Sequence, residues 1–254
     1  MILSRDGWLK RVREIKDLSA TRLREGDAVL AALRGSTKDS LAIFSNLGSC
    51  YVIRINDVPA STGYGEPVQK LLNFRDGEHV VAALVTSGNG PSAVPAGTLA
   101  IALTRKGFGF RFNLDPHREL STRAGRRFAK PAEGDEVVGV LPVAPKDVLC
   151  VVTADARALV CRAEDAAELA NPGRGVTMIK VAEGDEVVGF ALGKPKDEAV
   201  LVAELESGKK LPIGPGRYQV SGRGGRGHVL ARKAKVVRVH VPIEEPAEPP
   251  KLVN

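Results

Sequence analysis

The sequence has few aromatic residues, few cysteines and no long apolar run. Aromatic side chains make up 4% of its 254 residues, which disfavours a protein that stacks the bases of a single strand on its rings. The three cysteines, Cys50, Cys150 and Cys161, lack metal-ligand spacing, so we expect buried thiols of a reducing cytosol. No run of about 18 apolar residues occurs, so no membrane span is predicted.

Catalytic signatures are also absent. The sequence contains neither a Walker-type phosphate loop nor a Gly-x-Ser-x-Gly elbow. Gly222, Gly224 and Gly227 have the spacing of a dinucleotide fingerprint, but no βαβ pattern surrounds them, so we interpret this segment as a basic loop. The histidines are far apart and are expected at surface or strand positions: His79, His117, His228 and His240. An enzyme with a site in a central channel stays open as an alternative.

The clearest positive feature is an internal repeat. The segment Glu133–Gly139 is identical to Glu183–Gly189, and the offset is 183 − 133 = 50 residues. Looser copies of the acidic-Gly-acidic turn occur at Glu25–Asp27 and Asp76–Glu78, each followed by a short apolar strand. Gly provides the backbone freedom of a tight turn, and we expect both flanking carboxylates to stay in solvent.

Five hairpins alternate with these turns. Each consists of an apolar run, a polar or Gly corner and a second strand-like run. They are predicted at Ile2–Val12, Leu41–Ile53, Leu99–Phe110, Val148–Val160 and Val200–Leu211. A period of about 50 residues with this pattern is typical of a blade array. The sequence therefore predicts an all-β fold of about five four-stranded blades in a propeller-like disc over residues 1–243, followed by a disordered, acidic, proline-rich tail at residues 244–254.

The charge indicates an anionic partner. The formal net charge is +7 and the pI is about 9.4, and the acidic tail makes the folded part more basic still. Basic residues gather in the segments that join the repeats, often beside Gly, and such a surface gives salt-sensitive, sequence-independent affinity for nucleic acid. The candidate DNA-binding residues are Lys10, Arg11, Arg22, Arg123, Arg126, Arg127, Arg174, Arg223 and Arg226. A scaffold that uses these loops to bind acidic proteins remains the alternative.

The basic pair at residues 126–127 leads to a specific expectation. Replacement of Arg126 and Arg127 by Glu is expected to weaken duplex binding at moderate salt while the fold survives. No recognition helix is predicted, so we expect contact with the DNA backbone and no base-specific readout.

Four segments resemble the C-terminal domain of type IIA DNA topoisomerase A subunits. They are Asp6–Arg11, Ser45–Tyr51, Val58–Val68 and Val220–Leu230, and the resemblance covers roughly residues 1 to 242. It implies a β-pinwheel, in which four-stranded blades exchange strands with their neighbours and duplex DNA bends around a basic rim. It also implies two protein partners, the ATPase B subunit of the parent enzyme and the breakage-reunion domain of the same subunit, in the bacterial cytoplasm with the nucleoid. The chain is expected to be either a domain of that longer subunit or a separately encoded wrapping module.

The resemblance also bears on the branch of the family and on catalysis. Residues 18–24 stand where gyrases carry a Gln-Arg-Arg-Gly-Gly-Lys-Gly box in the first blade, and they lack it, whereas Gly222–Gly227 is only somewhat like the box. This favours the topoisomerase IV branch, with gyrase-type wrapping as the alternative. Tyr218 does not stand in the family's cleavage motif and is expected at a strand edge. The chain is therefore expected to be an accessory domain that does not cut DNA alone and holds no cofactor or metal.

Overall fold

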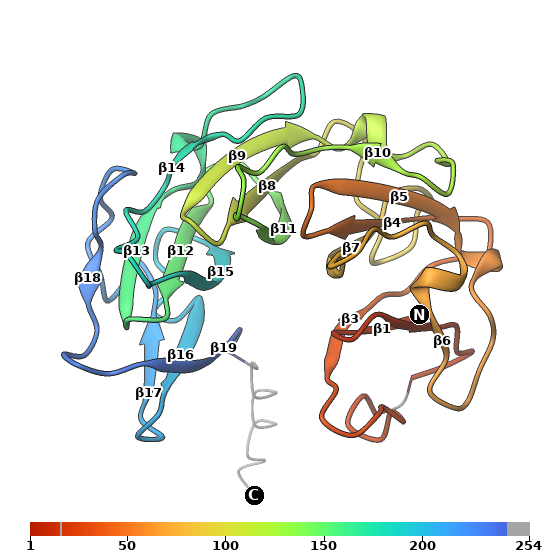
Figure 1. Ribbon diagram of the computed structural model, residues 1–254, viewed down its shortest axis with the longest axis horizontal. Helices are drawn as coiled ribbons and strands as arrows, with labels where there is room; N and C mark the ends of the chain where they lie inside the picture. The colour runs from red at the N-terminus through yellow and green to blue at the C-terminus, as the bar shows by residue number, and fades with distance from the viewer. Residues whose placement is uncertain (16, 243–254) are drawn as a thin grey trace, which may run out of the picture.

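The computed structural model describes residues 1–15 and 17–242, and over these ranges the protein is built from short antiparallel strands (Figure 1). The first blade contains β1 (Ile2–Ser4), β2 (Trp8–Lys10), β3 (Val29–Ala32) and β6 (Glu66–Pro67). The second contains β4 (Ser40–Ser45), β5 (Ser49–Arg54), β7 (Val80–Val85) and β10 (Arg126–Arg127). The third contains β8 (Leu99–Thr104), β9 (Phe108–Asn113), β11 (Val137–Val143) and β14 (Val176–Thr177).

Two further blades follow in the described part of the chain. The fourth contains β12 (Val148–Thr153), β13 (Arg157–Arg162), β15 (Val187–Gly193) and β18 (His228–Val229). The fifth contains β16 (Leu201–Leu205), β17 (Lys210–Ile213) and β19 (Val236–His240). Short 3-10 helices occur at η1 (Ile55–Asp57), η2 (Val68–Lys70), η3 (Asp115–His117) and η4 (Ala163–Asp165). All five predicted hairpins are present, and the prediction of about five blades is confirmed.

Neighbouring blades exchange strands. The strand β10 lies between β9 and β11 in the chain, yet it pairs with β5 of the preceding blade through Arg126↔Cys50 and Arg127↔Ser49. The strands β6, β14 and β18 likewise pair with the blade that precedes them. Each blade is thus held to the next by main-chain hydrogen bonds, as the resemblance to a pinwheel implied.

The fifth blade has three strands. The prediction of four strands in every blade is therefore wrong for this blade. Its outer strand β17 has no partner on its outer side within the described ranges. Residues 11–15 and 17–28 of the first blade occupy the corresponding place in the chain, but they form no strand there. The blades therefore follow an arc from β1 to β19 (Figure 1), and strand pairing does not join its two ends in the part of the chain described.

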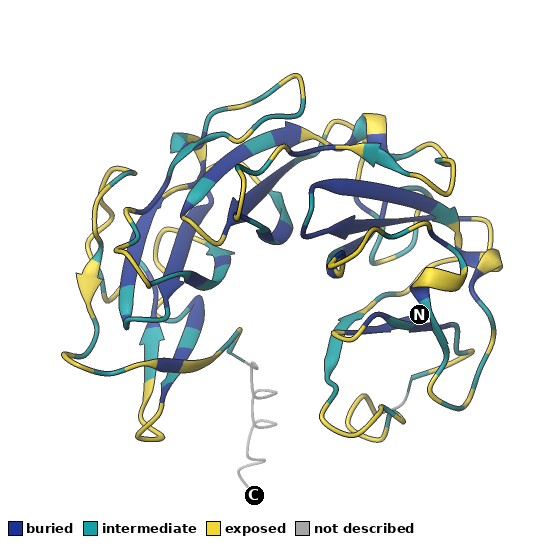
Figure 2. Cartoon of the chain, viewed as in Figure 1, coloured by how far each residue is buried: buried dark blue, intermediate teal, exposed yellow. Residues whose placement is uncertain are grey.

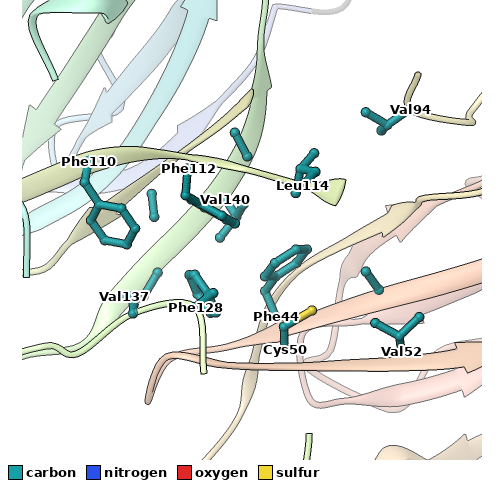
Figure 3. Packing of buried hydrophobic residues seen from close by; sticks show 14 residues of the cluster. Phe44, Cys50, Val52, Val94, Phe110, Phe112, Leu114, Phe128, Val137 and Val140 are labelled. Carbon is teal, nitrogen blue, oxygen red and sulfur yellow. The ribbon is translucent and has the colours of Figure 1, made fainter. Parts of the chain in front are cut away.

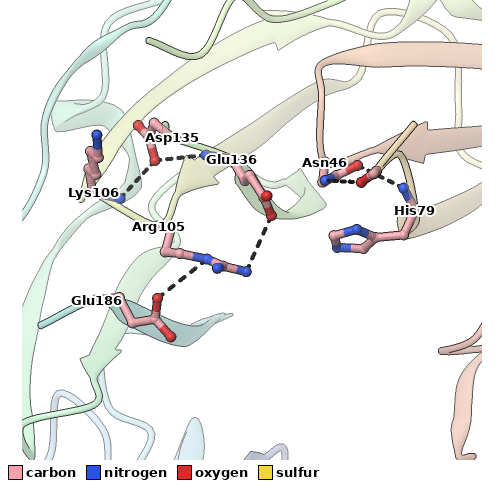
Figure 4. A network of polar contacts seen from close by, with 8 residues as sticks. Asn46, His79, Arg105, Lys106, Asp135, Glu136 and Glu186 are labelled. Carbon is pink, nitrogen blue, oxygen red and sulfur yellow. Dashed lines mark hydrogen bonds and ion pairs between the residues drawn. The ribbon is translucent and has the colours of Figure 1, made fainter. Parts of the chain in front are cut away.

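The acidic turns are more buried than the sequence predicted. Asp135 is 5% exposed, and its Oδ1 accepts the backbone N–H of Lys106 and of Glu136, both at 2.9 Å (Figure 4). The repeat-equivalent Asp185 accepts the N–H of Asp155 in the same way at 2.8 Å. The expectation that both carboxylates stay in solvent is wrong for the second acid of the turn, because it satisfies N–H groups of the adjacent hairpin corner.

The apolar core lies between successive blades, and Figure 2 shows it as dark strand segments flanked by exposed loops. At the contact of the second and third blades, Phe44, Phe112 and Phe128 meet with ring centroids 5.1 to 6.2 Å apart (Figure 3). His117 packs into this aromatic cluster, 5.7 Å from Phe112, and is 5% exposed. The expectation of a surface or strand position for His117 is therefore wrong, because the imidazole serves as a core ring.

Polar contacts also cross between blades. The Val187 N–H of the fourth blade donates to the Arg105 carbonyl of the third at 2.8 Å, and Val137 donates to Asn46 of the second at the same distance. The Arg105 guanidinium lies between Glu136, at 3.2 Å, and Glu186, at 3.5 Å (Figure 4). Because these groups are substantially exposed, the ion pairs add little stability, and the packed core holds the blades together.

The three cysteines are buried and free, as predicted. Burial raises the pKa of the Cys150 and Cys161 thiols to about 12. Tyr218 lies in a bend after β17, with its ring centroid 5.6 Å from that of His228 and the two ring planes tilted by 45°. The expectation of a strand-edge position for Tyr218 is therefore wrong.

Two further predictions concern a membrane span and the tail. Across the described ranges, no helix is long and apolar enough to cross a membrane. The predicted acidic tail, residues 244–254, lies outside the described residues.

Candidate nucleic-acid interface

The exchanged strands β6, β10, β14 and β18 form the outer perimeter of the arc (Figure 1). Each begins next to a glycine with positive φ: Gly65, Gly125, Gly175 and Gly227. At Gly175 a Cβ would come within 2.2 Å of the Gly109 carbonyl oxygen of the third blade. Only glycine fits such an approach. The glycine before each exchanged strand therefore packs directly against the main chain of the blade that the strand joins. Most other residues of the segment before the strand are exposed.

The candidate residues occupy these perimeter segments. Arg123, Arg126 and Arg127 belong to the segment of β10, Arg174 precedes β14, and Arg223 and Arg226 precede β18. Lys10, Arg11 and Arg22 lie together on the first blade, at and after β2. The structure thus brings the nine residues together in clusters on successive blades. Their role in DNA binding stays a prediction.

The nine residues share one property, which they have in common with most other described cations of the protein. Within residues 1–15 and 17–242, none of the nine lies within ion-pair distance of a carboxylate. Seven other basic residues are paired there: Lys70, Arg105, Arg111, Arg162, Lys194, Arg217 and Lys235. No neighbouring carboxylate neutralises the positive charge of such a side chain, so the charge remains available to attract an external anion.

Some of the nine nevertheless use their donors inside the protein. Arg126 donates to the carbonyls of Pro116 at 2.6 Å, Glu119 at 2.9 Å and Leu120 at 3.0 Å. Lys10 is 3% exposed, and its Nζ donates to the carbonyls of Arg22 and Gly63 at 2.8 and 2.7 Å. Burial, and then the neighbouring Arg22 charge, lower the pKa of Lys10. These two side chains hold the loops that present the others.

Others of the nine have exposed cationic ends. The Arg174 guanidinium carbon lies 4.5 Å from the Phe108 ring centroid, a cation–π arrangement that fixes the side chain but leaves it exposed. Arg127 makes one hydrogen bond, to the Leu47 carbonyl at 3.1 Å. Arg22 and Arg226 are exposed. Arg127 in β10, Arg174 before β14 and Arg226 before β18 therefore present charge at three successive places along the rim.

Sequence reasoning missed a second set of basic residues at the rim. In the first four blades, the hairpin corner carbonyl accepts the N–H of a residue that follows the exchanged strand: Val68, Phe128, Met178 or Leu230. Two residues after each of these stands an exposed cation: Lys70, Lys130, Lys180 or Arg232. The signal was present in the sequence, because Lys130 and Lys180 are separated by 180 − 130 = 50 residues, the period of the repeat.

Comparison with known proteins assigns the family. Residues 39–87, 100–144 and 147–193, more than half of the chain, match the family described as DNA gyrase C-terminal domain, beta-propeller. The chain belongs to this family. The matched stretches cover the second, third and fourth blades of the gyrase C-terminal domain fold described above, so the resemblance drawn from the four sequence segments is confirmed.

Curated relatives include both branches of the family. The chain is 28% identical over 240 residues to the A subunit of DNA gyrase from Aminobacterium colombiense, covering 91% of this chain and 28% of the relative. It is 27% identical over 181 residues to the A subunit of DNA topoisomerase 4 from Caulobacter vibrioides, covering 70% of this chain and 22% of the relative. The chain thus spans about a quarter of the length of these relatives.

Solved structures share the fold. The C-terminal domain of DNA topoisomerase IV superposes with a TM-score of 0.81 at 20% identity, over 95% of this chain and 76% of that one. The DNA gyrase A C-terminal domain superposes with a TM-score of 0.66 at 19% identity, over 96% of this chain and 82% of that one. At these identities the likeness establishes the pinwheel fold of this gyrase C-terminal domain family member and nothing finer.

Proposed function

We propose that this chain binds duplex DNA without sequence specificity and bends it around the outer rim, presenting a segment for strand passage by a type IIA topoisomerase. The observation that supports this proposal is the recurrence of exposed cations in or just before successive exchanged strands. Arg127, Arg174 and Arg226 are examples, and none has a carboxylate partner within the described ranges. Arginine meets a phosphate with a planar fork of donors.

The energetics require several blades to act together. Bending a duplex segment of 20–30 base pairs costs roughly 1–6 kcal/mol, which a single surface contact does not offset. Each phosphate contact releases condensed counterions, so affinity accumulates along the rim and falls with salt. An arc of blades with cations at similar positions distributes these contacts along a curved path.

We further propose the topoisomerase IV branch, with decatenation and relaxation as the activities of the parent enzyme. Residues 18–24 lack the gyrase-type box, and the fold has five blades. The alternative is a gyrase-type domain that supports negative supercoiling, which the Arg-Gly segment Gly222–Gly227 favours. In either case the chain acts as an accessory domain beside the ATPase B subunit and the breakage-reunion domain of the same subunit, in the bacterial cytoplasm.

A binding titration tests this function. The chain is titrated into a random-sequence duplex of about 40 base pairs over a series of KCl concentrations, with fluorescence anisotropy as the readout. We expect the logarithm of the association constant to fall linearly with the logarithm of salt concentration, by about 0.9 per phosphate contact. Absence of duplex binding at low salt, or binding that salt does not change, would reject the proposal in favour of a scaffold that binds acidic proteins.

A further inference from the structure

A pocket lies at the contact between the third and fourth blades. Its volume is about 490 Å³, and it opens on the face where β14 and the segment before β18 meet. Four cationic side chains line it, with the Phe108 ring as an apolar wall: Lys106, Arg157, Lys180 and Arg226. No carboxylate is among its lining residues in the described part of the chain.

The cations of this pocket retain donors for an outside ligand. Lys106 Nζ makes one hydrogen bond, to the Glu133 carbonyl at 3.1 Å, and Arg157 Nη1 reaches the carbonyls of Arg226 and Gly227 at 3.3 Å. The side chains of Lys180 and Arg226 donate to no protein group in residues 1–15 and 17–242, and none of the four cations forms an ion pair there. Like charges are costly to hold together without an anion, so the geometry fits a bound anion.

Equivalent positions at the other blade contacts are poorer in charge. The backbone N–H of Lys180 donates to Gly225, and that of Lys130 donates to Gly173 in the same manner, which aligns the two contacts residue by residue. At the contact of the second and third blades, Leu47 stands in place of Lys106, Phe108 in place of Arg157 and Arg127 in place of Thr177. Three cations remain there: Arg127, Lys130 and Arg174.

The contact of the first and second blades is poorer again. Asp6 stands at the corner position of Lys106, and Ala124 stands in place of Arg226. Two cations remain there: Lys70 is paired with Glu66, and Arg123 donates to the carbonyls of Lys70 and Leu71. Positive charge at the blade contacts therefore rises along the chain toward the third and fourth blades, although the fold repeats.

We propose that the pocket between the third and fourth blades is the principal anchor for the phosphodiester backbone of bound DNA. This inference rests on the proposed function and adds the position at which the duplex is held most tightly. Lys106 and Lys180, from the two sides of the pocket, supply point charges to a phosphate group, and Arg226 supplies a planar fork of donors. The duplex continues from this anchor along the other blade–blade contacts, each of which makes fewer contacts with phosphate groups.

The test compares two double variants of equal net charge. K106Q/K180Q removes two cations from the pocket, and K146Q/K196Q removes two exposed lysines from the repeated Pro-Lys-Asp turns, which lie outside the pocket. We expect K106Q/K180Q to bind the duplex about tenfold more weakly at moderate salt, with a salt slope shallower by about 2, because two phosphate contacts are lost. K146Q/K196Q should stay within about twofold of the unaltered chain.

The outcomes separate the anchor from the wider function. Equal, small losses in both double variants, with strong binding by the unaltered chain, would overturn the anchor and leave duplex binding in place. Failure of the unaltered chain to bind would overturn both. Inorganic tripolyphosphate serves as a second probe: if it binds the pocket while K106Q/K180Q leaves duplex affinity unchanged, the site serves free polyphosphate and the anchor is rejected. Melting temperatures check folding, and K180Q/R226Q provides a second pocket variant.

Discussion

At the residue scale, cations in one loop have different roles, and hydrogen bonding separates them. Arg126 and Arg127 are adjacent in sequence, yet their hydrogen bonds differ. Arg126 donates to three carbonyls near η3, whereas Arg127 donates to one, that of Leu47. Nothing in the sequence distinguishes them, because two adjacent arginines in a two-residue strand form no polar and apolar pattern that would show which side chain faces the protein. The double replacement by Glu is therefore a poor test of DNA binding, because it also removes a structural group.

Arg126 is predicted to be a determinant of stability. Replacement of Arg126 by Ala leaves the carbonyls of Pro116, Glu119 and Leu120 without their donor. We expect the free energy of unfolding in urea to fall by about 1–3 kcal/mol. The matched replacement Arg127→Ala should cost less than about 1 kcal/mol but weaken duplex binding. Equal stability losses in the two variants would contradict the division of roles.

His117 is predicted to make stability depend on pH. Burial, and then the nearby Arg126 charge, lower the pKa of His117 from 6.5 to about 4. The unfolded chain then binds more protons between these values, so the stabilisation is complete above pH 6.5 and is lost as the pH falls toward 4. The loss should reach about 3 kcal/mol.

The corresponding measurement is urea unfolding at about pH 4.5, 5.5 and 7, values that span the two pKa values. The His117→Phe variant, which keeps a ring among Phe44, Phe112 and Phe128, should show a flatter pH profile than the unaltered chain. Parallel profiles for the two proteins would show that His117 does not carry the effect.

At the element scale, the exchanged strands hold neighbouring blades together. Strands of two residues, such as β14, contribute few hydrogen bonds, so their placement depends on the glycine turn that precedes them. The sequence was sufficient to predict the five hairpins, because apolar alternation and corner residues are local signals. It did not predict the positions of the two-residue strands, because pairing between blades is long-range and leaves almost no periodicity in so short a segment.

Gly175 is predicted to tolerate no side chain. It has φ +83°, and a Cβ there would lie 2.2 Å from the Gly109 carbonyl oxygen, so Gly175→Ala must displace β14 from the third blade. We expect a loss of more than about 3 kcal/mol in the free energy of unfolding. Gly184 is a matched control, with φ +76° and nothing within 4 Å of its Cβ position, and Gly184→Ala should cost about 1–2 kcal/mol. Similar losses would show that conformational strain alone decides both.

At the scale of the whole molecule, a repeated fold carries a surface that does not repeat. The blades share their hydrogen-bonding pattern, yet the cations at the blade contacts increase toward the pocket lined by Lys106 and Lys180. The exact 50-residue repeat predicted the array, and clusters of Arg and Gly predicted the rim segments. The pocket was not predicted, because Lys106, Arg157, Lys180 and Arg226 come from four segments that only the exchange of strands brings together.

The most direct measurement of DNA bending around the rim is a ligation assay on nicked circular DNA. The nick is sealed by ligase in the presence of increasing amounts of the chain, and the topoisomers are separated after the protein is removed. A duplex wound along a curved basic path predicts a shift in mean linking number that grows to saturation, and K106Q/K180Q should reduce it at equal protein concentration. A topoisomer distribution that stays unchanged at saturating chain, under conditions where the duplex is bound, would contradict the account.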